Sequence, residues 1–321
     1  MSDFREWPDL ARRDVGGAVV AAGDESFAAK ENLITPGPAV FDPAVFGHRG
    51  KVYDGWETRR RREPGEDAAI VRLGAPGIVH GVVVDTAWFT GNYPPEVSVD
   101  GGTGPDGPWF PLVERSPVKG DGENPFAVDC PRRVTHVRLR IHPDGGVARL
   151  RVHGAALPDP ALIDALGTVD LAAVELGGRV TGCSNLFYSS PNNLLLPGPA
   201  RSMGEGWETA RRRDDGNDWV EIALGVPGTV AVAELDTSWF LHNAPGWAML
   251  RGRAGDGAWM DLLPRTPLEP DTRHRFVLDP VPVTAVRLDI LPDGGMARVR
   301  LHGRPSAAGR AALAARWSAA Q

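Results

Sequence analysis

Hydrophobic and polar residues alternate along many short segments of the chain, which is the period of a strand with one buried face. In the first half the alternation covers 18–22, 69–73, 79–85, 96–100, 134–141 and 147–153. In the second half it covers 179–183, 219–224, 230–236, 248–252, 283–290 and 296–302. Glycine and proline are frequent between these segments, with 39 and 29 residues among 321. Many short strands separated by turns predict an antiparallel β-sandwich or jelly roll.

Four segments predict helices instead. Residues 9–15 and 170–176 each begin with aspartate, which can cap a helix, and each precedes two glycines, which can end one. Residues 157–166 are expected to form a linker helix, and the alanine-rich residues 310–320 a terminal helix. Helix is therefore a minor part of the predicted fold.

Two repeated patterns predict turns. The Gly-x-Pro-Gly sequences at 74–77 and 225–228 are expected to close the strands that precede them. The Pro-Asp-Gly-Gly sequences at 143–146 and 292–295 suit turns between two strands.

The chain repeats itself. The sequence Gly-Trp-Glu-Thr-Arg-Arg at 55–60 returns as Gly-Trp-Glu-Thr-Ala-Arg at 206–211, displaced by 151 positions. The same register continues without a gap as far as Pro94 and Pro245. A repeat of this length indicates a duplicated domain rather than a short solenoid unit. We therefore predict an all-β protein of two tandem jelly-roll, galactose-binding-like β-sandwich domains. Their predicted bounds are 1–156 and 157–321, and the second carries the C-terminal helical tail.

Composition excludes several classes. A hydrophobic fraction of 42% and a charged fraction of 24% are typical of a soluble globular protein. The net charge of −6 gives no overall basic field, so no nucleic-acid partner is expected. No signal region or membrane-spanning stretch is recognised, and Cys130 and Cys183 stand in unlike contexts. We expect a cytoplasmic protein without a membrane partner, a disulfide framework or a zinc site.

The repeated arginine run is the first candidate for chemistry. If it is extended, the even-numbered side chains from Trp56 to Arg62 share one face, and the odd-numbered ones from Glu57 to Arg61 share the other. Such an arginine row can hold a carboxylate by paired hydrogen bonds, with Glu57 orienting one guanidinium. A solvated arginine face, or a structural ion pair with Glu57, explains the same pattern.

Acids and amides in loops are the second candidates. Asp85 and Asp236 each end a strand and can act as a base or an anchor, or merely cap a loop. Asn92 and Asn243 can bind an amide-like ligand or brace a turn. The aromatic residues beside them are expected to be core rather than a ligand platform: Trp88, Phe89, Trp239 and Phe240.

A third candidate is the Pro-Asp-Gly-Gly corner. With Arg149 in one copy and Arg298 in the other, it offers a carboxylate-binding corner, although backbone conformation also explains its glycines. No metal-binding histidine spacing, nucleophile elbow or phosphate-binding loop is present. Residue patterns alone therefore indicate a duplicated sandwich with acid, arginine and amide groups in loops, and no reaction.

Five segments carry a resemblance to a known family. They are 23–27, 31–33, 50–62, 85–95 and 143–150, and their counterparts in the second half extend it over nearly the whole chain. The most specific are the Gly-Trp-Glu-Thr-Arg-Arg run and the Phe-Thr-Gly-Asn-Tyr-Pro run at 89–94. Together these segments resemble allantoicase.

The resemblance implies two jelly-roll modules in each subunit, assembly into homo-oligomers, and hydrolysis of allantoate to ureidoglycolate and urea in purine breakdown. Allantoate is a carboxylate with two ureido arms, and arginine, acid and amide side chains suit these groups. Glu57 and Asp85 are the expected catalytic acid and base. The expected substrate-binding residues are Arg59, Arg60, Asn92, Asp144, Arg149, Glu208, Arg211, Asp236, Asn243 and Arg298.

Some features remain open at this level. Ala210 replaces the arginine of copy one, so copy one is expected to carry more of the site. No cofactor is indicated with certainty, and whether a divalent metal such as manganese takes part stays open. The alternative functions are a non-catalytic jelly-roll protein that binds a small carbohydrate-like ligand, and a hydrolase for a related ureido or guanidino acid.

Overall fold

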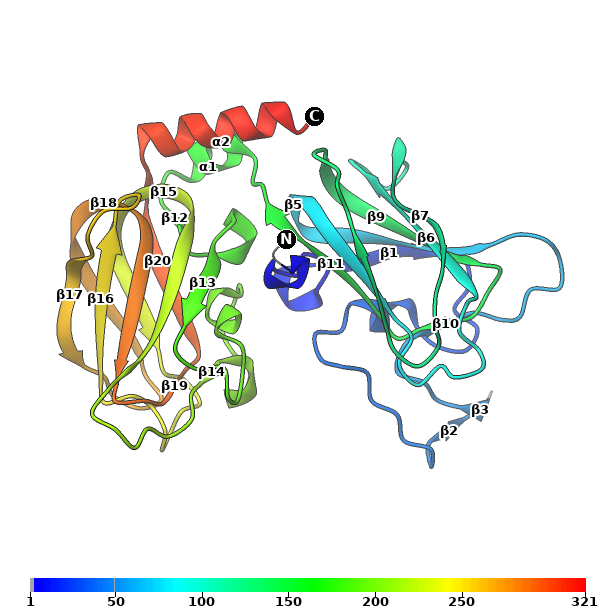
Figure 1. Cartoon of the computed structure of the whole chain (residues 1–321), viewed down its shortest axis with the longest axis horizontal. Helices are drawn as coiled ribbons and strands as arrows, with labels where there is room; N and C mark the ends of the chain where they lie inside the picture. The colour runs from blue at the N-terminus through cyan, green and yellow to red at the C-terminus, as the bar shows by residue number, and fades with distance from the viewer. Residues whose placement is uncertain (1–2, 49) are drawn as a thin grey trace. The chain divides into compact units, whose positions relative to one another are not determined.

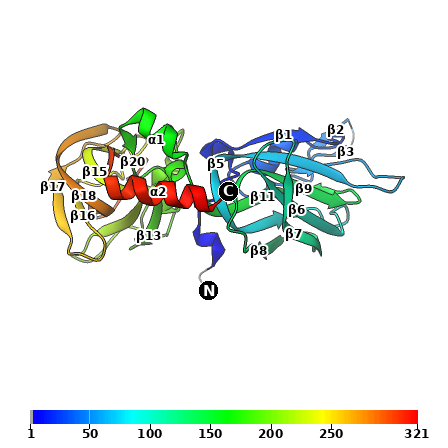
Figure 2. The same ribbon diagram turned by 90° about the horizontal axis from the view of Figure 1, so that it is seen from above.

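The computed structural model describes residues 3–48 and 50–321 (Figures 1 and 2). The chain divides into two compact units, one reaching Ala155 and the other covering Ala156–Ala319, while Ala320–Gln321 group with the first. Both units are built almost entirely from antiparallel strands. The predicted all-β fold of two tandem β-sandwiches is confirmed.

The first unit contains eleven strands within the described residues. They are β1 (Ala18–Ala22), β2 (Phe46–Gly47), β3 (Gly50–Lys51), β4 (Trp56–Glu57), β5 (Asp67–Asp85), β6 (Glu96–Gly102), β7 (Trp109–Pro117), β8 (Glu123–Ala127), β9 (Arg133–His142), β10 (Gly146–Val147) and β11 (Arg149–Ala156). Its short 3-10 helices are η1 (Phe4–Glu6), η2 (Arg13–Val15) and η3 (Lys30–Ile34).

The long strand β5 organises the first unit. Five strands follow the order β1-β5-β9-β6-β7, and β8 and β11 also pair with β5. β9 pairs with β5 between Asp67 and Ile78, and β8 pairs with it between Gly81 and Asp85. One strand therefore serves two sets of neighbours, as a sandwich requires, and it delivers Asp85 to one end of the unit.

The second unit repeats this arrangement. Its strands are β12 (Val169–Asp170), β13 (Arg179–Cys183), β14 (Trp207–Glu208), β15 (Asp218–Asp236), β16 (Trp247–Arg253), β17 (Met260–Pro267), β18 (Arg273–Leu291), β19 (Gly295–Met296) and β20 (Arg298–Pro305). Its helices are α1 (Pro160–Leu166), η4 (Val174–Leu176), η5 (Pro191–Leu195), η6 (Met203–Glu205) and α2 (Ala307–Ala319). The strand order is β12-β20-β15-β18-β16-β17, and β13 also pairs with β15.

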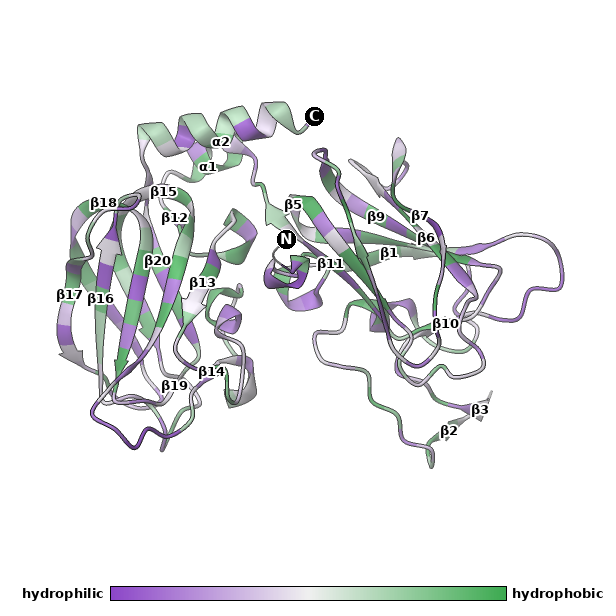
Figure 3. Cartoon of the chain, viewed as in Figure 1, coloured by the Kyte–Doolittle hydropathy of each residue, from purple (hydrophilic) through white to green (hydrophobic). Residues whose placement is uncertain are grey.

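Burial follows the alternation seen in the sequence. Along β5 buried and less buried residues alternate from Asp67 to Gly81, and β15 shows the same pattern from Asp218 to Thr229. Figure 3 shows the corresponding change between hydrophobic and hydrophilic residues along the strands. The period of two therefore identified the strands correctly, because one face of each is buried.

The two short helices predicted at 9–15 and 170–176 are wrong in their first halves. Only Arg13–Val15 and Val174–Leu176 are helical, each as a 3-10 turn. Asp9 forms a β-bridge with His153 of β11. Asp170, the first residue of the second predicted helix, belongs to β12, which pairs with β20. Pairing with a distant strand competes successfully with local helix formation here.

The turns predicted at 74–77 and 225–228 are also wrong. Both segments lie inside continuous strands, β5 and β15. The register against the neighbouring strand shifts at these positions, so the extra residues form an irregularity in the ladder rather than a reversal. The Pro-Asp-Gly-Gly segments do connect consecutive strands, β9 to β10 and β18 to β19.

Both longer predicted helices exist with shifted starts. α1 begins at Pro160 because Asp159 caps it, accepting a hydrogen bond from the Ala161 N–H at 2.8 Å. α2 begins at Ala307 and lies beside α1 and β15 (Figure 1). Leu313 of α2 is only 3% exposed, so the terminal helix packs on the second unit.

Candidate functional site

The repeated Gly-Trp-Glu-Thr stretch forms a short strand and then leaves the sheet. Trp56 on β4 is fully buried and donates its indole N–H to the carbonyl of Asp24 at 2.7 Å. Residues 58–62 belong to no strand. Beyond Glu57, side chains rather than a neighbouring strand hold this segment, and the alternation of its two faces stays a prediction.

Glu57 faces away from the core, since it follows the buried Trp56 in the strand. Its Oε1 accepts a hydrogen bond from the side-chain amide of Asn92 at 2.6 Å. Burial raises the pKa of the Glu57 carboxyl, and the bond from Asn92 opposes this rise. A glutamate with a raised pKa can exchange a proton at higher pH than an exposed one.

The second unit contains the same pair. Glu208 on β14 accepts a hydrogen bond from the Asn243 amide, again at 2.6 Å. Asn243 also contacts the sulfur of Met203 at 3.3 Å. The sequence predicted all four polar residues separately, and the structure joins them into two equivalent carboxyl–amide pairs.

The arginines after Thr58 divide into two roles. Arg59 and Arg60 are exposed, and the Nε of Arg59 lies 3.8 Å from Asp24. Arg61 turns back and donates from Nη1 to Oδ1 of the buried Asp67 at 2.7 Å. Residues 59–63 surround a cavity of about 330 Å³. Its exposed guanidinium groups suit an anionic ligand.

Aspartates hold the main chain of this arginine run. Asp24 accepts a hydrogen bond from the Arg59 N–H at 2.8 Å, and Asp144 accepts one from the Arg61 N–H at 2.6 Å. Asp293 makes the equivalent contact in the second unit. Asp144 therefore positions the backbone of this run through one of its carboxylate oxygens, and its ligand contact stays a prediction.

A second cavity of the first unit lies beside Glu57. Its volume is about 460 Å³, and it is lined by residues 25–29 and by His48 and Lys51 of the β2–β3 region. The main chain of Ala28 pairs with that of Glu57, so this cavity adjoins β4. The loop that supplies β2 and β3 is longer than its counterpart in the second unit.

The aromatic pairs after β5 and β15 divide between core and surface. Phe89 and Phe240 are fully buried, as predicted, whereas Trp88 and Trp239 are 45% and 50% exposed. Both tryptophans have positive φ, 72° and 74°, which is rare for a bulky residue. The Trp88 N–H is held by Asp121 at 2.8 Å. The prediction of a core role is therefore wrong for the two tryptophans.

Asp85 and Glu57 have different hydrogen-bond partners. Its Oδ1 accepts a hydrogen bond from the Ala87 N–H at 2.8 Å. Burial raises the pKa of the Asp85 carboxyl, and the nearby charge of Glu123 adds to the rise. Among the described residues, no hydrogen bond joins Asp85 to Glu57, and their joint role as catalytic acid and base stays a prediction.

Arg149 is committed to the fold. Its side chain is 1% exposed, and its five N–H groups donate to the carbonyls of Gly37, Pro38, Asp54 and Ala148 and to the Asp54 carboxylate. A guanidinium has five N–H donors, so none is left for a ligand. The predicted carboxylate clamp at Arg149 is replaced by a structural role.

The remaining predicted residues lie in the second unit. Arg298 donates to the carbonyls of Gly198 and Glu205 and is 3% exposed, which repeats the arrangement of Arg149. Asp236 is 1% exposed and ends β15. Arg211 is exposed, like Arg60 in the first unit. Only Arg211 of these three is therefore open to solvent.

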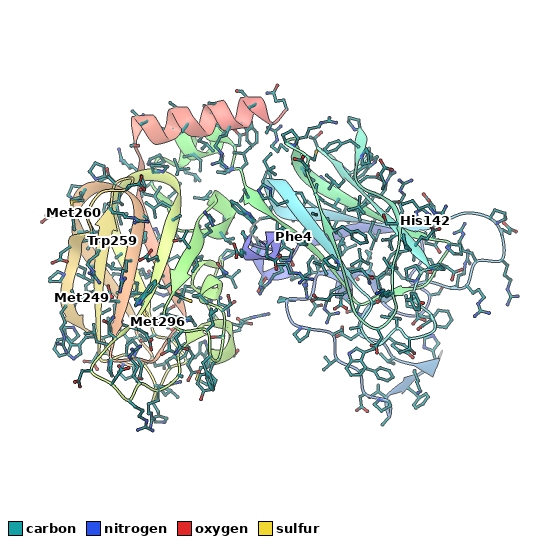
Figure 4. The ribbon with its side chains drawn as sticks, viewed as in Figure 1. Phe4, His142, Met249, Trp259, Met260 and Met296 are labelled. Carbon is teal, nitrogen blue, oxygen red and sulfur yellow. The ribbon has the colours of Figure 1, made fainter. Side chains whose placement is uncertain are left out.

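A serine, a histidine and an acid form a chain in the first unit that the sequence did not reveal. The Ser98 Oγ lies 3.0 Å from His142 Nε2, and His142 Nδ1 lies 3.0 Å from Glu66. Figure 4 labels His142 in the first unit. Ser98 is 2% exposed and lines none of the described cavities, so it has no room for a substrate. Met249 and Leu291 stand at the serine and histidine positions of the second unit.

Neither a metal centre nor a membrane span is found in the part of the chain that the structure describes. Across 3–48 and 50–321, no three His, Cys, Asp or Glu side chains are grouped so as to hold a metal ion. No helix of the same residues is long and apolar enough to cross a membrane.

Comparison with known proteins identifies the family. The model of the allantoicase repeat matches residues 8–157 and again residues 169–306. The chain belongs to the allantoicase family. The probable allantoicase of Nocardia farcinica is 61% identical over 313 residues, covering 94% of this chain and 95% of that protein. The probable allantoicase of Streptomyces coelicolor is 50% identical over 336 residues, covering 98% and 89%.

A solved structure of the same family has the same fold. The crystal structure of allantoicase from Saccharomyces cerevisiae superposes with a TM-score of 0.82 at 33% identity, covering 92% of both chains. Each allantoicase repeat of the present chain thus carries one carboxyl–amide pair and one exposed arginine segment. The repeat with Arg59 and Arg60 contains the two cavities described above, of about 330 and 460 Å³.

Proposed function

We propose that this allantoicase-family chain hydrolyses allantoate to ureidoglycolate and urea, a step of purine degradation. The observation that supports this most directly is the Glu57–Asn92 pair, joined at 2.6 Å. Glu57 stands two residues before the exposed Arg59 and Arg60 in the chain, whose segment surrounds a cavity. One repeat thus combines a proton-exchanging carboxyl, an amide and an anion-binding surface. These are the groups that a ureido acid requires.

The substrate is placed by its charge and by its ureido arms. Arg59 and Arg60 donate to the carboxylate, and charge-assisted hydrogen bonds of this kind are stronger than neutral ones. Asn92 keeps one donor hydrogen and its carbonyl for a ureido arm, because only one N–H is used on Glu57. Asp24 and Asp144 keep the arginine segment in place through its backbone.

The reaction exchanges one ureido nitrogen of the central carbon for a water oxygen. Protonated Glu57 gives its proton to the departing ureido nitrogen as the C–N bond breaks, and urea leaves with that proton. The carboxylate of Glu57 then takes a proton from the water that bonds to the central carbon. One water is consumed, one urea is released, and Glu57 returns to its protonated state. The raised pKa of Glu57 favours the first of these steps.

Asp85 remains a candidate for a supporting role rather than a partner of Glu57. Its raised pKa and its place at the end of β5 make it a group that can hold a proton near the loop carrying Asn92. We assign Glu208, Asn243 and Arg211 to the equivalent positions of the second repeat. Ala210 removes one of the two exposed arginines there, so we assign turnover chiefly to the first repeat.

We also propose the setting in which this chain works. The functional modules are residues 1–156 and 157–321, and the partner is a small molecule rather than nucleic acid. The chain assembles into homo-oligomers and acts in the cytoplasm. Resemblance to the family supports assembly, and the acidic overall charge of −6 supports the absence of a nucleic-acid partner.

Urea release from allantoate tests the proposal in matched variants of the two repeats. Glu57→Gln preserves size and an acceptor for Asn92 but cannot transfer a proton, so kcat should fall by about 10²–10⁴-fold. Glu208→Gln is the matched control and should retain most of the activity. Full turnover by the Glu57→Gln protein would remove this residue from proton transfer. No urea release by the unmodified chain would refute the activity itself.

A further inference from the structure

The second unit contains a charged cavity that the proposed reaction does not use. It has a volume of about 190 Å³ and lies where β15 ends. Its charged lining residues are Glu234, Asp236, Arg273, Arg298 and Arg300. Three guanidinium groups thus face two carboxylates, which leaves a net positive charge. The volume is below the range of about 300–1,000 Å³ typical of sites for drug-sized molecules, so a smaller ligand is indicated.

Hydrogen bonds fix the frame of this cavity. The Thr237 hydroxyl donates to the carbonyl of Glu269 at 2.7 Å. The N–H of Trp239 donates to Asp271 at 2.8 Å, and its indole N–H donates to the carbonyl of Ala200 at 2.9 Å. Three loops are therefore held together around the end of β15. A positive φ at Trp239 is maintained by these contacts.

Arg273 is available to a ligand. Its Nε lies 3.4 Å from Glu234 Oε1 and 3.6 Å from Asp236 Oδ2, which are ion-pair distances but long for hydrogen bonds. Its side chain is 43% exposed, and the structure records no hydrogen bond from it within the described chain. Arg275 holds the other oxygen of Glu234 at 2.7 Å. Arg273 can therefore turn its donors towards an incoming anion.

Arg300 offers a second guanidinium from the inner wall. Its Nη2 donates to the carbonyls of Leu196 and Gly198. Its Nη1 is buried without a hydrogen-bond acceptor and lies 3.5 Å from Oδ2 of Asp170. A buried donor without an acceptor is unfavourable, and a carboxylate oxygen in the cavity can supply one.

The first unit keeps three of these charges, as Asp85, Arg149 and Arg151, and changes the other two. Register places Glu123 opposite Asp85 where the second unit places Arg273 opposite Asp236. Val83 stands where the second unit has Glu234. An anion would therefore meet the carboxylate of Glu123 in the first unit and the guanidinium of Arg273 in the second. Conservation of fold alone does not account for this reversal of charge.

We propose that the cavity at Asp236 is a second binding site of the chain, for a small carboxylate that carries a ureido group. Arg273 and Arg300 hold the carboxylate, and Asp236 and Glu234 accept the ureido N–H groups. The ureido part of this assignment rests on the proposed function, whereas the carboxylate part rests on the charges of the cavity. Ligands of this class include substrate, product and their analogues.

Calorimetric titration of the full chain with N-carbamoylglycine tests this site. That probe has one carboxylate and one ureido arm, and lacks the second arm that the reaction releases. In the Arg273→Glu protein, which receives the charge found in the first unit, affinity at one class of sites should fall more than tenfold. Glu123→Gln changes the equivalent position of the first unit and should leave the titration unaltered. Identical titrations of the unmodified and Arg273→Glu proteins would overturn the site.

Two further measurements keep the outcome interpretable. Arg273→Gln retains hydrogen-bond donors without the charge, so it should weaken the same class of sites even if Arg273→Glu disturbs folding. Acetate should bind more weakly than N-carbamoylglycine, and equal binding of the two would overturn the ureido part. Urea release from allantoate is measured in parallel. Its absence would refute the proposed function while loss of binding in Arg273→Glu still supported the carboxylate site.

Discussion

Glu57 combines partial burial with a hydrogen bond to one neutral amide, and this affects stability as well as catalysis. Its raised pKa means that the folded chain holds this proton more tightly than the unfolded chain. The resulting stabilisation is complete below the ordinary glutamate pKa and is lost as pH rises through the raised value. A neutral side chain avoids that loss.

We therefore expect Glu57→Gln to be more stable than the unmodified protein at neutral pH while it loses activity. The guanidinium chloride concentration at the midpoint of unfolding, measured from about pH 4 to about pH 8, should fall less with rising pH in the variant. Glu63→Gln, which changes an exposed glutamate of the same segment, serves as the control. Parallel curves for Glu57→Gln and the unmodified chain would contradict the expectation.

The buried His142 should change the stability of the fold with pH in the direction opposite to Glu57. Burial lowers the pKa of its imidazole, with Arg115 and Arg140 reinforcing the shift and Glu66 and Glu96 opposing it. Because the folded chain binds this proton more weakly, stability is present above the ordinary imidazole pKa and is lost as pH falls below it.

A double variant that copies the second repeat measures this contribution. Ser98→Met with His142→Leu places there the side chains found at Met249 and Leu291. We expect its unfolding midpoint to decrease less between about pH 7.5 and about pH 5.5 than that of the unmodified protein. An unchanged slope with pH would show that His142 is not the group responsible.

At this scale the sequence identified residue types better than their roles. Arg60 and Arg149 looked alike as carboxylate binders, yet one is exposed and the other donates to carbonyls of residues 37, 38, 54 and 148. Three of these acceptors are about a hundred residues away in sequence, so no local pattern announces them. The Ser98–His142–Glu66 chain was missed for the same reason, because three separate segments supply it.

Among the elements, β5 shows how a local turn signal is overridden. Its Gly-x-Pro-Gly segment contains Gly77, where an added Cβ would lie 2.6 Å from a Leu10 methyl and 2.7 Å from the carbonyl oxygen of Ala155. The absence of a side chain lets neighbouring segments pack against the strand as it changes partners. The pattern therefore marked a close approach rather than a chain reversal.

Gly77→Ala should consequently destabilise the first unit by about 1–3 kcal/mol, since the neighbouring backbone cannot move away freely. Gly91→Ala is the matched control, because nothing lies within 4 Å of a Cβ at that glycine. Unfolding of both variants by guanidinium chloride measures the difference in their free energies of unfolding. Equal midpoints would mean that the chain around Gly77 relaxes without cost.

Strand positions were predictable because one buried face imposes a period of two on the sequence. The helical turns at 13–15 and 174–176 were predicted too long, since main-chain pairing with β11 and β20 is invisible locally. The exposure of Trp88 and Trp239 was equally hidden. It depends on contacts with loops that include Asp121 and Asp271.

For the molecule as a whole, two cores imply two cooperative units. Arg149→Met leaves the Asp54 carboxylate of one unit without its partner, and Arg298→Met removes the donor bonded to the carbonyls of Gly198 and Glu205 in the other. Loss of one member of a buried ion pair costs about 3–5 kcal/mol, and loss of a donor to buried acceptors costs about 1–3 kcal/mol. Calorimetry should therefore show two transitions, one lowered by each variant. A single transition lowered by both would show that the units unfold together.

The duplication itself was the most predictable feature, because Gly-Trp-Glu-Thr recurs with enough identity to establish the register. The division of the polar residues into separate groups was not predictable. It depends on how the loops after β5 and β15 meet distant segments, and on single substitutions such as Glu123 for Arg273. The sequence patterns that the two copies share therefore predict the fold, whereas the substitutions that distinguish the copies decide which charges lie at the end of each long strand.

Arg149 and Arg298 have one more consequence, for where this architecture accepts new sequence. Arg149 grips Gly37 and Pro38 on one side of a loop and Asp54 on the other. Between those anchors the first half carries β2 and β3, while Ala39 and Tyr53 pack on the buried Phe89 of the sandwich. The exposed strand β2, whose Phe46 is 63% exposed, is therefore the place where grafted sequence should disturb the core least.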